Sequence, residues 1–476
     1  MTPDRSEAED FLARAAEHAR QYRLHDRPRA PVASAAWLRD RFCGPLPEHG
    51  VPGSVVVDEL VAAAEPGLVP NTGADFYAWV MGGSNLVGVA ADWLTAAWGQ
   101  NAAIFQSSPA AAIAEEAVEV WLLDLLDLPR ESSVGFVTGA TTAAFVGLAA
   151  ARGEVLSRAG HDFDVLGLQG APQVGVFLSE DAHVTNYAAL RQLGFGDANF
   201  HRLPSDAAGL MHPKDLSRAL ARFGGPAIVV AQAGHINSGG FEPLHEIAGI
   251  ARAHDAWMHV DGAFGLWARA SATRRHLAAG AELADSWSVD GHKWLQIPYD
   301  SGFAIVRDRV AHRRAMQKTA GYLNADAEDG RNPSAYAPGL STRARGFAAW
   351  AVIRSLGRSG VQDLVDRLCM AASLIANRIR DIDGLVVSNR VELNQVIVTS
   401  ADEVDGRGQI LALADRLNAD GRIFVRTATW QGRTVLRLSV ISQETTDDNA
   451  IELAEAIRTH WIEVRAAQPR LVELTA

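Results

Sequence analysis

Cysteine is scarce in this chain of 476 residues: there are two, Cys43 and Cys369, far apart in the sequence. A chain of this length buries enough apolar surface to fold without disulfides, and so few cysteines are typical of a reducing compartment. Basic residues are outnumbered as well, since 44 Lys and Arg against 56 Asp and Glu give a net charge of −12. Such a composition offers phosphate backbones no basic surface and argues against nucleic-acid binding.

Long apolar segments are scarce too. Residues 1–20 are charged and contain no apolar core, so we expect no signal peptide and a cytoplasmic protein. Residues 132–151 carry no charge and are long enough to cross a bilayer, but they include Gly135, Gly139, Gly147 and three threonines. We therefore expect no membrane-spanning segment, and we find no internal repeat or low-complexity tract.

Short apolar runs, rich in valine, isoleucine and phenylalanine, alternate with helical stretches through the middle of the chain. This alternation predicts an α/β fold with a mainly parallel sheet covered by helices on both faces. In such sheets, ligands bind at the carboxyl ends of the strands. The predicted strands are 174–179, 227–232, 256–261, 286–290 and 303–307.

The two ends of the chain differ from this middle part. Two helical patterns near the N-terminus, 7–20 and 55–64, are separated by prolines and predict a helical arm over residues 1–70. A long helical pattern begins after residue 341 and is followed by strand-like runs and terminal helices. We therefore expect a large α/β domain over residues 71–340 and a smaller α+β domain over residues 341–476.

Two short motifs follow predicted strands and carry reactive side chains. Lys293 lies in SVDGHKW (288–294), and a lysine among apolar and aromatic neighbours can form an imine with an aldehyde. Asp261 lies in HVDGAFG (259–265), where a carboxylate can keep a pyridine nitrogen protonated. Taken singly, the first motif is better explained by a surface lysine after a strand, and the second is also typical of an N-cap or turn aspartate.

Two further features suit a phosphorylated ring. Residues 136–152 read as a loop followed by a helix, with Gly139 at the turn and Thr141 and Thr142 at the start of the helix. Free backbone N–H groups and the helix dipole favour a phosphate there. His183, in SEDAH after a predicted strand, can stack on a ring. A capped core helix and a structural histidine are the plain alternatives.

The order of these features along the chain is more specific than any one of them. Together with the stretches 241–265 (FEPLHEIAGIARAHDAWMHVDGAFG) and 284–302 (ADSWSVDGHKWLQIPYDSG), it resembles the group II decarboxylases of amino acids that depend on pyridoxal 5′-phosphate (PLP). Aromatic-L-amino-acid, glutamate and histidine decarboxylases belong to that family. The resemblance runs from about residue 75 to residue 446. It implies the aspartate aminotransferase fold (fold type I) with a seven-stranded sheet, PLP as cofactor, and a homodimer with active sites at the interface.

Matching positions in the family imply roles for single residues. Lys293 would carry the cofactor as a Schiff base, and Asp261 would pair with its pyridine nitrogen. His183 and Ala263 would lie against opposite faces of the ring, and His183 would act in catalysis with Lys293. The residues implied around the phosphate are Thr141, Thr142, Asp290 and His292.

Family members also carry a tyrosine on a mobile loop, which returns a proton to the substrate carbon after CO₂ has left. In this chain the corresponding segment begins after Lys318 and contains Tyr322 and Tyr336. Neither falls on the family position, and Tyr336 is the closer candidate for the third catalytic residue.

The sequence departs from the family pattern in three other ways. Thr142 replaces a usual acidic residue, Gly291 replaces a frequent proline, and His235-Ile236 replaces a Thr-Thr pair. An imidazole at position 235 would lie near the cofactor or the substrate and would change substrate choice or reaction.

The resemblance implies decarboxylation of an L-amino acid to its amine. Phe76, Tyr77 and Trp79, in a segment that lines the family's substrate pocket, favour an aromatic or other bulky side chain over an acidic one, unless they are simply core residues. The residues near Ser107–Ala110 would also line that pocket. The alternatives are oxidative decarboxylation to an aldehyde, a carbon–carbon lyase, a metal enzyme and a non-catalytic scaffold. The histidines match no compact metal motif.

Overall fold

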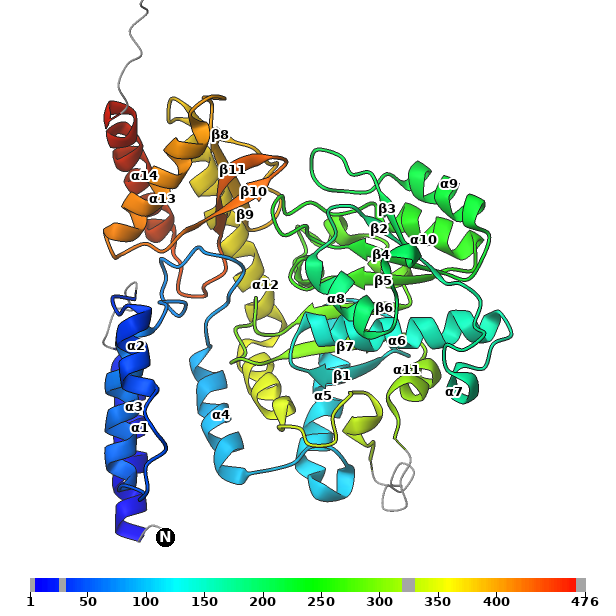
Figure 1. The fold of residues 1–476 in the computed structure, drawn as a ribbon, viewed down its shortest axis with the longest axis horizontal. Helices are drawn as coiled ribbons and strands as arrows, with labels where there is room; N and C mark the ends of the chain where they lie inside the picture. Colours follow the sequence, from blue (N-terminus) through cyan, green and yellow to red (C-terminus); the bar gives the residue numbers. More distant parts are fainter. Residues whose placement is uncertain (1–4, 25–30, 319–329, 468–476) are drawn as a thin grey trace, which may run out of the picture.

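The computed structural model describes residues 5–24, 31–318 and 330–467. It shows a helical arm, a large domain built on one sheet, and a small domain built on a second sheet (Figure 1). The three lie in the parts of the chain where the sequence predicts them. The division at residues 70 and 340 stays a prediction.

The large sheet has seven strands in the order β1-β7-β6-β5-β4-β2-β3. Strands β6, β5, β4, β2 and β3 are parallel, and β7 runs antiparallel to both of its neighbours. The strands are β1 (Ser133–Val137), β2 (Gly175–Ser179), β3 (Phe200–Leu203), β4 (Ala227–Gln232), β5 (Trp257–Asp261), β6 (Ser286–Asp290) and β7 (Gly302–Val306). This is the predicted fold type I sheet. All five predicted strands are present, whereas β1 and β3 were not predicted.

Helices cover both faces of this sheet, because alternate residues along its strands are apolar on each side. One face is covered by α6 (Ala140–Arg158), α8 (Val184–Gln192) and α11 (Arg309–Met316), which enclose a core of their own. The other face packs against helices that share the largest core. These are α5 (Pro109–Leu125), α9 (Pro213–Phe223), α10 (Leu244–Ala253) and the first half of α12 (Arg345–Arg380). A short helix, α7 (Phe163–Leu166), follows α6.

The small domain has an antiparallel sheet in the order β10-β11-β9-β8. Its strands are β8 (Leu385–Val387), β9 (Gln395–Ser400), β10 (Arg426–Trp430) and β11 (Arg433–Ser439). Helices α13 (Gly406–Ala419) and α14 (Asp447–Ala467) pack together beside it. Helix α12 connects the two domains and is kinked at Gly357, which has a φ of 62°.

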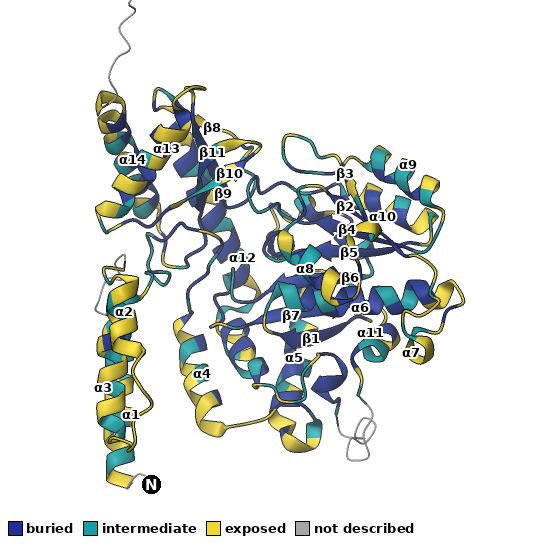
Figure 2. Ribbon diagram, in the orientation of Figure 1, coloured by how far each residue is buried: buried dark blue, intermediate teal, exposed yellow. Residues whose placement is uncertain are grey.

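The N-terminal arm projects away from both domains and is largely exposed (Figure 2). It contains the two predicted helices, α1 (Arg5–Leu24) and α3 (Gly53–Ala64), and an additional one, α2 (Ala35–Phe42). Helix α4 (Leu86–Trp98) follows the arm. No helix in the described ranges is long and apolar enough to cross a membrane. The uncharged stretch 132–151 is not one helix: it contains β1, a turn and the first part of α6.

The segment 75–85 joins the two domains. Phe76 pairs with Phe424 of the small domain, and the two rings stack with centroids 5.3 Å apart. Farther along, Gly82 lies directly against the Lys293 backbone: a Cβ at this position would be 2.0 Å from the Lys293 carbonyl oxygen. Only glycine fits this close approach.

Candidate active site

A cavity of about 380 Å³ lies where β4, β5 and β6 end and α6 begins. This is the edge of the sheet where the strand pattern predicts a ligand. The structure brings all eight predicted cofactor-binding residues into its lining. They are Thr141, Thr142, His183, Asp261, Ala263, Asp290, His292 and Lys293.

Lys293 follows β6 and extends its amine into this cavity. Its Nζ lies 2.9 Å from Asp290 Oδ2 and 5.8 Å from the centroid of the Phe264 ring. The chain contains three lysines, and Lys293 is the one that lines the cavity. A mobile amine beside an aromatic wall is suited to bond with an aldehyde.

Asp261 ends β5, and its buried carboxylate is held from two sides. The amide Nδ2 of Asn186, on α8, donates to Oδ2 at 2.7 Å, and the backbone N–H of Ala263 donates to Oδ1 at 3.2 Å. A carboxylate has about four acceptor positions, so capacity remains for a donor from the cavity. Asp261 is thus oriented to meet a protonated ring nitrogen.

His183 is the N-cap of α8. Its Nδ1 accepts the backbone N–H of Thr185 at 3.4 Å and lies 2.7 Å from the Thr185 hydroxyl. With Nδ1 used as an acceptor, the ring proton resides on Nε2. Burial lowers the pKa of His183, so the ring is neutral at neutral pH and presents an apolar face with one donor.

The N-terminus of α6 forms another wall. Gly139, its N-cap, supplies no side-chain cap, and Asp290 Oδ1 accepts the Ala140 N–H at 2.6 Å. The N–H groups of the next helical residues, Thr141 and Thr142, have no acceptor within a helix and suit an anion. Asp290 accepts hydrogen bonds here, so it shapes the loop and does not itself donate to a phosphate.

His292 and Tyr299 complete that side of the cavity. Their rings are 4.4 Å apart between centroids, and His292 Nε2 lies 3.5 Å from Asp290 Oδ1. Burial lowers the pKa of His292 and, with the charge of Asp290, raises the pKa of Tyr299 to about 12. Both groups are therefore neutral at neutral pH, and Tyr299 keeps its hydroxyl proton.

Comparison with known proteins identifies the family. The model of the pyridoxal-dependent decarboxylase conserved domain matches residues 52–399. The chain belongs to the pyridoxal-dependent decarboxylase family. It is similar to tryptophan decarboxylase 1 of Oryza sativa subsp. japonica, with 28% identity over 87% of this chain and 85% of the relative. It is also similar to 4-hydroxyphenylacetaldehyde synthase of Rhodiola rosea, with 26% identity over 90% of this chain and 89% of the relative.

A solved structure agrees with this assignment. The crystal structure of Oryza sativa TDC with PLP and tryptamine superposes with a TM-score of 0.90 at 25% identity, covering 97% of this chain and 99% of that one. The cofactor of the decarboxylase family is PLP, and its members are carboxy-lyases. The fold and the cofactor expected from the sequence are thereby confirmed.

The cavity of this decarboxylase fits PLP group by group. Lys293 would offer the amine for the aldehyde, Asp261 would accept from the ring nitrogen, and the start of α6 would supply the N–H donors for the phosphate. Gln232 Nε2 is buried and has no hydrogen-bond partner among the described residues, which is typical of a group that meets a ligand. We therefore assign the PLP site of this family member to this cavity.

Several predicted residues do not reach the cavity. Tyr336 is buried against the core, with the Arg331 guanidinium 4.7 Å from its ring centroid and its carbonyl accepting from His312 Nε2 at 3.0 Å. Tyr322 lies outside the described residues. Phe76 and Tyr77 are core residues, and neither the segment 75–85 nor Ser107–Ala110 lines the cavity.

His235 also lies outside the lining, unlike its neighbours Gly234 and Ile236. Its Nε2 lies 3.2 Å from the Asp181 carbonyl oxygen, its Nδ1 accepts from the Asn237 N–H at 3.3 Å, and its ring packs on Trp430. Both ring nitrogens are used by the fold, so His235 does not offer a free ring nitrogen to the cavity. Of this pair of residues, Ile236 is the one that lines the cavity. No group of three or more metal-binding side chains occurs in the described parts of the chain.

Sequence reasoning missed Asn186, Gln232 and Tyr299. Asn186 and Tyr299 each follow a recognised motif within one turn or loop, so a wider window around His183 and Lys293 would have included them. Gln232 ends a predicted strand, and its position beside Asp261 follows only from the pairing of β4 with β5.

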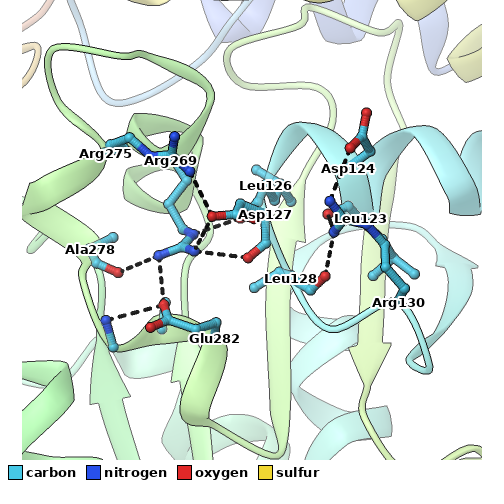
Figure 3. Close-up of polar contacts among 12 residues, drawn as sticks. Leu123, Asp124, Leu126, Asp127, Leu128, Arg130, Arg269, Arg275, Ala278 and Glu282 are labelled. Atoms are coloured by element: carbon cyan, nitrogen blue, oxygen red, sulfur yellow. Dashed lines mark hydrogen bonds and ion pairs between the residues drawn. The ribbon is translucent and has the colours of Figure 1, made fainter.

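A second hollow, of about 680 Å³, lies at the opposite edge of the sheet, where β1 and β6 begin. Figure 3 shows that its centre is Arg269. This guanidinium donates to the carbonyls of Leu126, Asp127 and Ala278 and pairs with Asp127 and Glu282. Its charges are paired within the protein, so this hollow is structural.

Proposed function

We propose that this enzyme decarboxylates an L-amino acid with an aromatic or other bulky side chain and releases the amine and CO₂. The observation that carries the proposal is the meeting of Lys293, Asp261 and His183 in one cavity at the strand ends. The similarity to tryptophan decarboxylase 1 supports an aromatic substrate.

The side chains of the cavity wall also support a bulky apolar substrate. Ile236, Phe264 and Tyr299 give it apolar and aromatic surface. Lys293 is the cavity's only lysine or arginine, and it is needed for the cofactor. An acidic substrate side chain would therefore lack a cationic partner among the described lining residues.

Each catalytic side chain has a task that its contacts support. Bound PLP supplies an electron sink for the electrons of the Cα–carboxylate bond. Lys293 would hold the cofactor through its amine, and Asp261 would keep the proton on the ring nitrogen. His183 covers the ring, excludes water from that face, and offers its Nε2 proton to the substrate.

An aldehyde product is the second candidate. Two observations favour it: the similarity to 4-hydroxyphenylacetaldehyde synthase, and the burial of Tyr336 away from the cavity. In that reaction O₂ and one water molecule are consumed, and the substrate is converted to aldehyde, CO₂ and ammonia, with H₂O₂ as the reduced product. Oxygen uptake in step with CO₂ release would identify it.

We also propose a cytoplasmic homodimer. The arm and α4 expose large apolar side chains that a partner subunit would cover; they include Leu12, Leu60, Trp93, Leu94 and Trp98. Both cysteines are free thiols in the structure, which suits a reducing compartment. Light scattering of the purified chain should give twice the mass of one chain, and removal of residues 1–70 should shift the mass towards the monomer.

The function is tested by incubating the holoenzyme with a panel of L-amino acids. We expect CO₂ and the matching amine with L-tryptophan, L-tyrosine or L-phenylalanine, and no O₂ uptake. Borohydride reduction followed by peptide mapping should place PLP on Lys293 and on neither of the other two lysines. CO₂ release only from acidic or small amino acids would refute the proposed substrate class.

A further inference from the structure

Gln232 has a buried side chain that the proposed mechanism does not use. It ends β4 and is 3% exposed, and its backbone is fixed because Glu242 Oε2 accepts its N–H at 2.8 Å while its carbonyl accepts the Glu242 N–H at 3.2 Å. Its side chain lines the PLP cavity. Its Nε2 is buried and has no partner among the described residues, although buried amides are nearly always hydrogen-bonded.

The order of the strands indicates which part of PLP this amide meets. In PLP the ring carbon that carries the aldehyde, C4, lies opposite the ring nitrogen and between the C3 oxygen and the C5 arm that carries the phosphate. Asp261 on β5 and Lys293 after β6 define the axis from the nitrogen to C4. The start of α6, which follows β1, places the phosphate on the β1 side of this axis. With the phosphate there, the C3 oxygen would face the other side, where β4 lies.

The β4 side of the cavity contains few groups that can bind this oxygen. Strand β4 and the loop after it contribute Gln232, Gly234 and Ile236 to the lining. Of these three, only Gln232 has a side chain that donates a hydrogen bond. It is also the direct neighbour of Asp261 across the pair of strands, so its amide lies beside the group that holds the ring nitrogen.

We propose that the Gln232 side-chain amide donates a hydrogen bond to the C3 oxygen of PLP and holds that oxygen in its anionic form. An amide donor stabilises negative charge on the oxygen. The amide and Asp261 together fix the tilt of the ring from two adjacent strands. The inference rests on the PLP site and does not depend on which amino acid is the substrate.

The test uses Gln232→Leu, which removes the amide at similar volume. We expect PLP to bind about tenfold more weakly, as for loss of one hydrogen bond, and the visible band of the holoenzyme to shift toward the shorter-wavelength neutral form. Without PLP, the variant should unfold at the same temperature as the wild type or higher, because a buried unpaired amide has been removed. The variant should thus lose affinity for PLP without losing stability.

Gln409→Leu is the matched control. Gln409 is another buried glutamine, but it lies in the small domain, where its Oε1 accepts the Ser400 hydroxyl at 2.5 Å. This control should lower the unfolding temperature and leave the spectrum and the PLP dissociation constant unchanged. If Gln232→Leu does not fold, Gln232→Met, which keeps the unbranched shape, gives the same readouts.

Unchanged PLP affinity and spectrum in both Gln232 variants would overturn the inference. That result is distinguishable from failure of the proposed function: the wild-type enzyme would still show its Lys293-dependent visible band and release CO₂. A wild-type protein that binds PLP and shows the expected Gln232 effects, but produces aldehyde, would refute the proposed product and leave this inference standing.

Discussion

The two hollows at opposite edges of the large sheet differ in how their polar groups are used. The larger one, around Arg269, has its central cation paired with carboxylates and carbonyls of the protein itself (Figure 3). The smaller one, at the strand ends, is lined by Gln232, whose Nε2 has no partner among the described residues. The start of α6 also lines it, and the first N–H groups of a helix have no acceptor within that helix. Size therefore does not indicate which hollow binds a ligand; unsatisfied hydrogen-bonding groups do.

The largest effect is expected for Lys293→Ala. Loss of the amine removes the covalent attachment of PLP, so turnover should fall below detection and the visible band should disappear. Lys214→Ala, which changes an exposed lysine on α9, should retain both. Measurable turnover and a normal visible band in Lys293→Ala would show that this cavity is not the PLP site.

A smaller but still large effect is expected for Asp261→Asn. The amide cannot hold a proton on the ring nitrogen, so the electron sink weakens, and kcat should fall on the order of 10²-fold or more. PLP should still attach to Lys293, which borohydride reduction would show. A kcat within a few-fold of the wild type would mean that another group protonates the ring.

Arg269→Met tests the other hollow. The change leaves three backbone carbonyls without their donor and Glu282 without its arginine, while Asp127 keeps its pairing with Arg275. We therefore expect about 3 kcal/mol of destabilisation. Denaturant unfolding of the full chain measures this loss. The cofactor spectrum and kcat of the folded fraction should be unchanged, and a selective loss of PLP affinity would contradict the structural role.

The smallest effect is expected for Tyr336→Phe. Its ring packs against Arg331 and lies outside the cavity lining, so kcat should change by no more than about threefold. Tyr322→Phe is the companion variant from the same segment. A large fall in kcat for Tyr336→Phe, with aldehyde as a new product, would show that Tyr336 is the proton donor.

The site was predictable where chemistry and sequence order coincide. Lys293, Asp261 and His183 each follow a strand, and parallel strands bring their carboxyl ends to one edge. Gln232 could not be singled out, because a glutamine that ends a strand has no distinctive sequence pattern. Its place in the site follows from its pairing with Asp261 on β5. Tyr336 was placed by its distance along the chain, which says nothing about the aromatic and cationic contacts that bury it.

The fold was predictable where apolar runs have clear boundaries. Strand β3 (FHRL) is short, lies at the edge of the sheet and contains two polar residues, so it lacks the signal of a buried strand. Strand β1 continues through one turn into the alanine-rich helix α6, and the uncharged stretch hid the boundary between them. In both cases, pairing with a distant strand decides the structure.

The contact between Gly82 and the Lys293 backbone has a consequence for the order of folding. The reactive lysine takes its final position only after a segment from far earlier in the chain has docked behind it, and that segment is itself paired with Phe424. Contacts between such distant residues form slowly, because closing long loops costs entropy. We therefore expect the ability to bind PLP to appear late in refolding, after most helical signal has returned.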